Sequence, residues 1–272
     1  MKKIARLYFA DQRQIDFWDK VYDQDDVRGA RYTQRMKLAL ACLDAAALPA
    51  DGAVLDAGCG AGRVGMEVMR RGYQLYGLDF SHGMLARARE IHKGMSGLVL
   101  RLAQGDVESL PLGEACFDAV VCLGVISYLP GLDKALGEMS RVLKPGGILV
   151  VSFINRARVV RFLDLAGQTA SRTRRLIARM STTGSGGSRP AVDVRRRAYL
   201  IPRFFEALQR SGFTVLGYDT TPYEPLTFLG RAIYPRRFAA MLTGLMERPS
   251  GLPFIESVGG ICVVKAQKRK TS

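Results

Sequence analysis

An acid and three closely spaced glycines stand out in the run Val54–Arg63, where a short apolar segment gives way to an amphipathic one. Asp56 precedes Gly58, Gly60 and Gly62 in this run. Glycine suits a turn between a strand and a helix, because it adopts unusual backbone angles and lets a ligand approach the main chain. The spacing GxGxG differs from the phosphate-binding GxGxxG, and a carboxylate here would repel a pyrophosphate. A ligand that carries an ammonium group suits this turn better.

The segments that must position this turn alternate between apolar and amphipathic from residue 53 onward. Strands so apolar, separated by helices, are typical of a parallel sheet covered on both faces. The pattern predicts an α/β fold with a doubly wound, seven-stranded, mostly parallel Rossmann-like sheet. We expect strands at 53–58, 74–79, 98–106, 117–125, 147–153, 213–219 and 259–267, and helices at 63–71, 82–93, 132–143 and 202–211.

The order of these motifs resembles the class I S-adenosylmethionine-dependent methyltransferases, in particular the small-molecule type. The run 56–62 is similar to the first motif of that family, and an acid, Asp79, ends the second strand about twenty residues later. Asp106 follows the third strand, and LKPGGILVVSF matches the fifth. The likeness covers roughly residues 50–155 and implies S-adenosylmethionine as the cofactor.

The resemblance also implies roles for individual residues. Asp56 would face the cofactor's ammonium group, Asp79 would accept both ribose hydroxyls, and Asp106 would read the adenine amino group with Val107 beside the ring. Ser81 is expected to cap the following helix, and Met84 is either core or a contact with adenine. The full set of expected cofactor contacts is Tyr22, Asp56, Gly58, Cys59, Gly60, Gly62, Asp79, Phe80, Met84, Asp106, Val107 and Leu123.

Catalysis in such a family rests mainly on positioning, because the cofactor brings an activated methyl group. The segment Gly124–Tyr128 follows the fourth strand and should border the reacting methyl group, at the carboxyl ends of the strands. Many small-molecule members have a histidine near this place, and this chain has none. The sequence therefore does not identify a general base. Tyr128 is the candidate catalytic residue, either to orient the acceptor or only as a wall of the pocket.

The N-terminal region is predicted to form a helical lid. Apolar residues recur at helical spacing between about residues 13 and 48, and the run Phe17–Tyr22 resembles the lid of related enzymes. Tyr22 would reach the cofactor's carboxylate, and Arg31 or Arg35 would pair with it or with an anionic substrate. Ordinary helix packing explains each of these residues equally well. We therefore divide the chain into a lid (1–48), a cofactor-binding core (49–155), an Arg-rich insertion (156–200) and the rest of the core (201–272) with a second insertion at 220–257.

Positive charge is concentrated in one segment. The chain carries +15 at pH 7, and the stretch Arg156–Arg197 alone carries +9, from eleven arginines against two acids. An amphipathic basic helix of this kind is typical of contact with an anionic membrane surface, and a solvated cap over the pocket is the alternative. The second insertion is rich in apolar residues. Together the two segments favour a lipid-like small-molecule acceptor, methylated on a hydroxyl or an amine.

A nucleic-acid-binding protein or RNA methyltransferase that uses residues 156–197 is the alternative function. The segment has few interleaved aromatic residues for base stacking. Neither a [DNS]PP[YFW] box after the fourth strand nor a Pro-Cys pair is present. Nucleic acid is therefore the less favoured partner.

Cysteine and histidine usage limits the remaining possibilities. Five scattered cysteines without a CxxC pair are typical of a reducing compartment, and two separated histidines predict no metal site. His92 is expected on the surface. Arg6 and Asp11 interrupt the N-terminus before an apolar stretch forms, so we expect no export signal. These features predict a cytoplasmic protein, with peripheral contact to the inner face of a membrane as a further expectation.

Overall fold

The computed structural model describes residues 2–94, 100–157, 196–221, 227–228, 231–232 and 260–270. Most of the Arg-rich insertion and most of the second insertion lie outside these residues. The predicted basic helix and its membrane contact therefore stay predictions.

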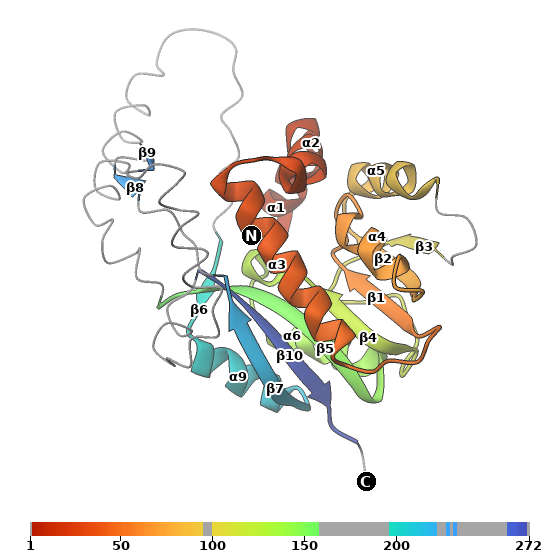
Figure 1. Ribbon diagram of the computed structural model, residues 1–272. Coiled ribbons are helices and arrows are strands. Elements are labelled where there is room, and N and C mark those ends of the chain that lie inside the picture. The colour runs from red at the N-terminus through yellow and green to blue at the C-terminus, as the bar shows by residue number, and fades with distance from the viewer. Residues whose placement is uncertain are drawn as a thin grey trace, which may run out of the picture.

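A mixed sheet forms the centre of the fold, with the strand order β3-β2-β1-β4-β5-β10-β7 (Figure 1). All neighbours up to β5 pair in parallel, whereas β10 is antiparallel to both β5 and β7. A short strand, β6, also pairs with β5. The α/β fold class and the seven main strands predicted from the sequence are confirmed. The strands are β1 (Ala53–Ala57), β2 (Gln74–Asp79), β3 (Leu100–Gln104), β4 (Phe117–Cys122), β5 (Leu143–Asn155), β6 (Ala198–Tyr199), β7 (Phe213–Thr220) and β10 (Ile261–Lys268), with a separate pair of β8 (Thr227–Phe228) and β9 (Arg231–Ala232).

Helices cover both faces of this sheet. One apolar cluster joins Leu136 and Phe204 to the sheet, and the other joins Leu43 and Val68 to its opposite face. The fold is therefore doubly wound, as the apolar character of the strands predicted. The helices are α1 (Lys2–Phe9), α2 (Gln12–Lys20), α3 (Val27–Asp44), α4 (Arg63–Met69), α5 (His82–His92), α6 (Asp133–Val142) and α9 (Ile201–Arg210), with 3-10 turns η1 (Val21–Asp23) and η2 (Ile126–Tyr128).

The N-terminal region differs from the sequence expectation. It was expected to be helical from about residue 13 to 48, but an additional helix, α1, precedes this range, and α3 ends at Asp44. Asp11 separates α1 from α2, because its side chain accepts the backbone N–H of Arg13 and caps α2. A break at residues 24–26 then allows α3 to run back along the sheet, where its contacts with β5 and β10 lie. In Figure 1, α1 and α2 lie together at one end of the sheet, where α2 also contacts α5.

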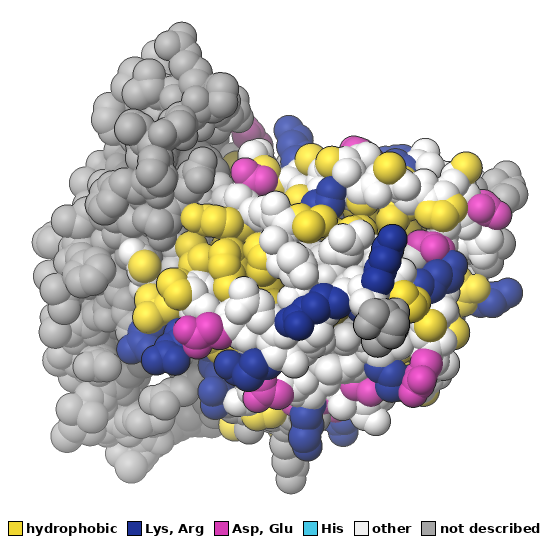
Figure 2. All heavy atoms as spheres, turned by 90° about the horizontal axis from the view of Figure 1, so that it is seen from below, with side chains coloured by type: hydrophobic (Ala, Val, Ile, Leu, Met, Phe, Trp, Pro, Cys, Tyr) yellow, Lys and Arg dark blue, Asp and Glu magenta, His cyan; other side chains and the backbone are white. Residues whose placement is uncertain are grey.

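The surface seen in Figure 2 carries lysines and arginines interspersed with acidic side chains. In this view the coloured, described part of the chain shows no continuous basic patch. Among the described residues, no helix is long and apolar enough to cross a membrane.

Candidate functional site

The glycine turn leaves β1 at the point where the strand order of the sheet reverses, between β1 and β4. Ligands bind at such switch points in open α/β sheets. Gly58 has φ 85°, and a Cβ placed on it would lie 2.2 Å from Val125 Cγ2. Gly60 has φ 53°, and a Cβ on it would meet nothing within 4 Å. The turn therefore requires glycine at the first position for packing, and at the second it leaves the backbone open to the pocket.

Asp56 lies at the bottom of this pocket, 2% exposed, at the end of β1. Its Oδ2 atom is buried and has no hydrogen-bond partner among the described residues. Burial, and then the nearby carboxyl group of Asp79, raise its pKa to about 7, against the opposing effect of Arg35. An unpaired buried carboxylate is costly, so a bound cation would stabilise it.

Asp79 ends the neighbouring strand, β2, and holds the glycine turn. Its Oδ2 accepts the backbone N–H of Gly60 at 3.0 Å, and its Oδ1 accepts the N–H of Ser81 at 2.8 Å. Burial raises the pKa of this carboxyl, while these two hydrogen bonds oppose the shift. Each oxygen keeps a second lone pair, so the carboxylate can still accept two ligand hydroxyls. Ser81 caps α5, as expected, by accepting the N–H of Met84.

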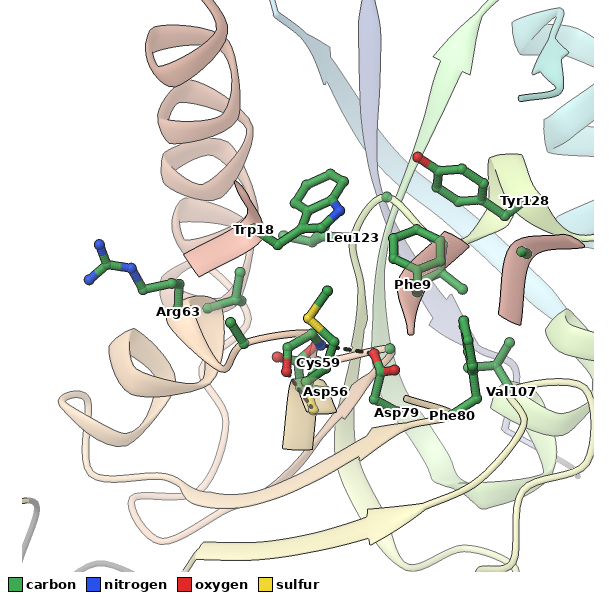
Figure 3. Close-up of a pocket in the computed structure, with 18 of the residues that line it drawn as sticks. Phe9, Trp18, Asp56, Cys59, Arg63, Asp79, Phe80, Val107, Leu123 and Tyr128 are labelled. Atoms are coloured by element: carbon green, nitrogen blue, oxygen red, sulfur yellow. Dashed lines mark hydrogen bonds between the residues drawn. The ribbon is translucent and has the colours of Figure 1, made fainter. Parts of the chain in front are cut away.

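Phe80, Asp106 and Val107 line the side of the pocket nearest β2 and β3. In Figure 3, Phe80 and Val107 lie side by side, on the same side of Asp79. Asp106 accepts the N–H of Glu108 at 3.0 Å and lies 3.6 Å from the guanidinium of Arg6 on α1. This wall of the pocket therefore combines two apolar side chains with one carboxylate.

The helices α1 and α2, here called the lid, close the opposite side of the pocket. Phe9 and Trp18 face the space above Asp56 and Asp79 (Figure 3). Phe9 packs edge-on against both Phe80 and Tyr128, with ring centres 5.7 and 5.0 Å apart. Trp18 Nε1 is a buried donor without a partner in the part of the chain that the structure describes.

Polar contacts attach this lid to the core. The Oγ of Ser81 donates to the carbonyl of Phe9 at 2.9 Å, and Arg87 on α5 pairs with Asp19 at 2.7 Å. Arg63 on α4 donates to the carbonyl of Asp19 at 3.0 Å and also pairs with Asp23. Because these contacts reach both α4 and α5, the lid is held over the glycine turn.

Arg35 enters the pocket from α3 and is 3% exposed. It donates to the hydroxyl of Tyr22 at 3.1 Å and stacks over the ring of Tyr32 at 4.9 Å. Its Nε has no hydrogen-bond partner among the described residues. Arg31 stacks over the same Tyr32 ring from outside the pocket lining. Of the two arginines that the sequence left open, Arg35 is therefore the one placed to meet a ligand.

Tyr128 lies in η2, directly after β4, and its hydroxyl points away from Asp56 and Asp79 (Figure 3). Burial raises its pKa to about 12, and nearby arginines only partly oppose this effect. The phenol is therefore neutral near pH 7 and can donate a hydrogen bond. It is a poor general base, because such a group works best with a pKa near the working pH.

The structure gathers nearly all of the expected site residues around one pocket of about 1060 Å³, its open mouth included. Gly62 is the exception: it begins α4, and a Cβ on it would lie 2.6 Å from His92 Cε1. Its role here is close packing between α4 and α5. The pocket-lining residues from the expected set are Tyr22, Asp56, Gly58, Cys59, Gly60, Asp79, Phe80, Met84, Asp106, Val107, Leu123 and Tyr128.

Two sequence interpretations need correction or extension. His92 was expected on the surface, but it is 5% exposed, and its Nδ1 lies 2.6 Å from the carbonyl oxygen of Ala88. Arg6 and Phe9 also line the pocket, and neither was expected there from the sequence. Ile4, Leu7 and Tyr8 recur at helical spacing, which was the signal for an amphipathic helix over these residues.

Within the described residues, no group of three or more His, Cys, Asp or Glu side chains is arranged to hold a metal ion. The thiol of Cys59 is buried beside Asp56 and Asp79, and its pKa is raised, mainly by burial. The thiol therefore stays protonated and packs as a small apolar group.

Part of the chain matches a known protein family. Residues 55–151 match the family described as "Methyltransferase domain". The chain is 38% identical over 96 residues to a malonyl-[acyl-carrier protein] O-methyltransferase of Pectobacterium atrosepticum, covering 35% of this chain and 36% of that protein. It is 38% identical over 102 residues to a phosphatidylethanolamine N-methyltransferase of Cereibacter sphaeroides, covering 37% of this chain and 49% of that protein. The matched segment thus spans between a third and a half of these relatives.

The fold has close solved counterparts as well. A magnesium protoporphyrin IX methyltransferase from Synechocystis, with bound S-adenosylhomocysteine, superposes with a TM-score of 0.64 at 16% identity and covers 98% of this chain and 99% of that one. At this identity the likeness concerns the fold. Together with the family match, it confirms the resemblance to class I methyltransferases that the motifs indicated.

Proposed function

We propose that this chain, which contains a methyltransferase domain at residues 55–151, is an S-adenosylmethionine-dependent methyltransferase. Its acceptor would be a small, lipid-like molecule methylated on a hydroxyl or an amine. The observation that carries the proposal is the pair of acids at adjacent strand ends, in which Asp56 has an unpartnered buried oxygen and Asp79 holds the glycine turn.

The polar atoms of the pocket suit the amino-acid end of this cofactor. Asp56 offers a buried acceptor for an ammonium group, and Arg35 and Trp18 offer buried donors without partners in the described structure. The hydroxyl of Tyr22 lies beside Arg35. An acceptor and several donors in one pocket would pair with the two charges of a zwitterion, so the fit explains why these polar atoms are left unsatisfied.

The remainder of the pocket suits the nucleoside. We assign the ribose hydroxyls to Asp79, the adenine amino group to Asp106, and the faces of the adenine ring to Phe80 and Val107. When bound, S-adenosylmethionine supplies a methyl group on a positively charged sulfur. The residues of the chain then hold the acceptor in line and exclude water from the pocket.

The acceptor side is mostly apolar. Phe9, Leu123, Val125 and Leu129 line it, together with the ring of Tyr128. The neutral phenol of Tyr128 would donate a hydrogen bond that orients the acceptor. The relatives named above include both an O- and an N-methyltransferase, and the second is named for a phospholipid. These names and the apolar lining support a lipid-like acceptor that is methylated on either an oxygen or a nitrogen.

Calorimetry with S-adenosylmethionine and S-adenosylhomocysteine tests the cofactor. We expect one site per chain and no binding of NAD, whose pyrophosphate Asp56 would repel. Incubation with methyl-labelled S-adenosylmethionine and fractionated cell extract then tests the acceptor. Label in the lipid or small-metabolite fraction supports the proposal. Label only in nucleic acid, with an affinity for RNA that falls steeply with salt, would instead support the alternative function.

A further inference from the structure

Arg196 brings a positive charge to the acceptor side of the pocket. Its guanidinium hydrogen-bonds to the side chain of Tyr32 and interacts electrostatically with Tyr8 and Tyr128. Tyr8 belongs to α1, Tyr32 to α3 and Tyr128 to η2. Tyr128 lines the pocket itself, and Tyr8 packs against Phe9, which also lines it, with ring centres 5.0 Å apart. The cluster therefore lies beside the part of the pocket wall that Phe9 and Tyr128 form.

The main chain fixes Arg196 in this place. The N–H of Arg197 donates to the carbonyl of Ser127 at 2.7 Å, directly beside Tyr128. Two residues further, β6 pairs with β5, and the N–H of Arg156 donates to the carbonyl of Tyr199 at 2.8 Å. Main-chain hydrogen bonds thus attach residues 197–199 to β5 and to η2, although the chain before Arg196 lies outside the described residues. Arg196 keeps contact with solvent, so a ligand can reach it.

The cluster is rich in donors, and Asp11, whose charge acts on Tyr8, already pairs with Arg13. No carboxylate pairs with Arg196 in the ranges that the structure describes. Burial raises the pKa of Tyr8 and of Tyr128, so both phenols stay neutral and can donate. Arg35 adds a second guanidinium, 4.9 Å from the centre of the Tyr32 ring. Guanidinium groups and hydroxyls together suit a carboxylate or a phosphate, whose oxygens accept several hydrogen bonds at once.

We propose that the acceptor carries a carboxylate or phosphate next to its apolar part, and that Arg196, with Tyr8, Tyr32 and Tyr128 around it, binds this anion. This inference rests on the proposed methyltransferase function and narrows its acceptor. The anion would lie beside Tyr128, while the apolar part contacts Phe9 and Leu129. A purely structural role, in which Arg196 only fastens the lid through Tyr32, is the competing explanation, and it predicts no preference for anions.

Binding of simple probes tests the inference without knowledge of the natural acceptor. Octanoate, octyl phosphate and octan-1-ol share an apolar chain and differ in charge. Each is titrated by calorimetry into the full chain, with and without saturating S-adenosylhomocysteine. We expect octanoate or octyl phosphate to bind at least about tenfold more tightly than octan-1-ol. The stronger of the two anions shows whether a carboxylate or a phosphate is preferred.

Two variants test whether Arg196 is responsible for the preference for anions. Arg196→Gln should weaken anion binding about tenfold and leave S-adenosylhomocysteine binding unchanged, whereas Arg196→Lys should recover part of the loss. Arg203→Gln, on the outer surface of α9, removes a similar charge far from the pocket and should change nothing. Thermal melts confirm that each variant is folded.

Equal binding of the alcohol and both anions would overturn the inference, as would anion binding that Arg196→Gln leaves intact. A protein that fails to bind S-adenosylhomocysteine would overturn the proposed function instead. The anion titrations without S-adenosylhomocysteine would still decide the role of Arg196 in that case.

Discussion

The carboxylate of Asp79 accepts the backbone N–H of Gly60 at 3.0 Å, which joins the end of β2 to the glycine turn after β1. One side chain therefore shapes the turn and also faces the pocket. The same carboxylate also accepts the N–H of Ser81, the residue that caps the N-terminus of α5. Any change at Asp79 should alter both the ligand contacts and the turn.

Replacement of Asp79 by alanine should weaken S-adenosylhomocysteine binding strongly. The loss of two charge-assisted acceptors for ribose hydroxyls corresponds to roughly 1.5–3 kcal/mol for each hydrogen bond. Calorimetry on the folded variant measures it. Asp133→Ala, an exposed acid on α6 that pairs with Arg210, is the control. Unchanged affinity in Asp79→Ala would contradict the ribose assignment.

Gly60→Ala, compared with a control glycine, tests whether the cofactor approaches the backbone of the turn, apart from the effect of backbone strain. At φ 53° an alanine costs roughly 1 kcal/mol of stability, and its Cβ would occupy the open side of the turn. Gly72→Ala is a matched control, because Gly72 also has a positive φ, 85°, and lies outside the pocket lining. We expect both variants to melt at similar, slightly lower temperatures, and only Gly60→Ala to lose cofactor affinity. An equal affinity in both variants would show that the ligand does not approach this backbone.

Cofactor binding should depend on pH through Asp56. In the free protein the pKa of this buried carboxyl is raised to about 7, so the group is largely protonated below pH 7. A ligand ammonium group needs the ionised form, and binding must therefore release a proton at low pH. We expect the affinity to fall as pH decreases from 7.5 to 5.5, by up to about tenfold per pH unit. Asp56→Asn should bind weakly at every pH and show a flat profile over this range, and a flat profile in the native protein would argue against the assignment.

Tyr128→Phe should keep cofactor affinity and lower turnover by less than about tenfold. With a pKa raised to about 12, the phenol is protonated throughout the neutral range and orients the acceptor as a donor. The pH profile of kcat should keep its shape in the variant. A loss of ~10²–10⁴-fold, together with a changed profile, would instead identify the phenol as a general base.

Local sequence patterns were enough to predict the sheet and one wall of the pocket. Asp56 and Asp79 lie at the ends of β1 and β2, Asp106 follows β3, and parallel strands bring their carboxyl ends to one edge. The glycines at 58 and 60 lie in the same short run as Asp56, so their placement needed no long-range information. Apolar alternation likewise predicted both helical layers, because burial on two faces leaves a clear pattern in the strands.

Contacts between distant segments decided the rest. The lid depends on Phe9 meeting Phe80 and Tyr128, about seventy and one hundred and twenty residues away, and no periodicity in the sequence records such a contact. Packing of α4 on α5 likewise gave Gly62 its role and buried His92. The sequence by itself therefore determined the main strands and the acids that lie at or just after the ends of the first three. Only the tertiary structure decided which side chains become buried without partners, and with that the raised pKa of Asp56 and of Tyr128, because desolvation depends on everything packed around a group.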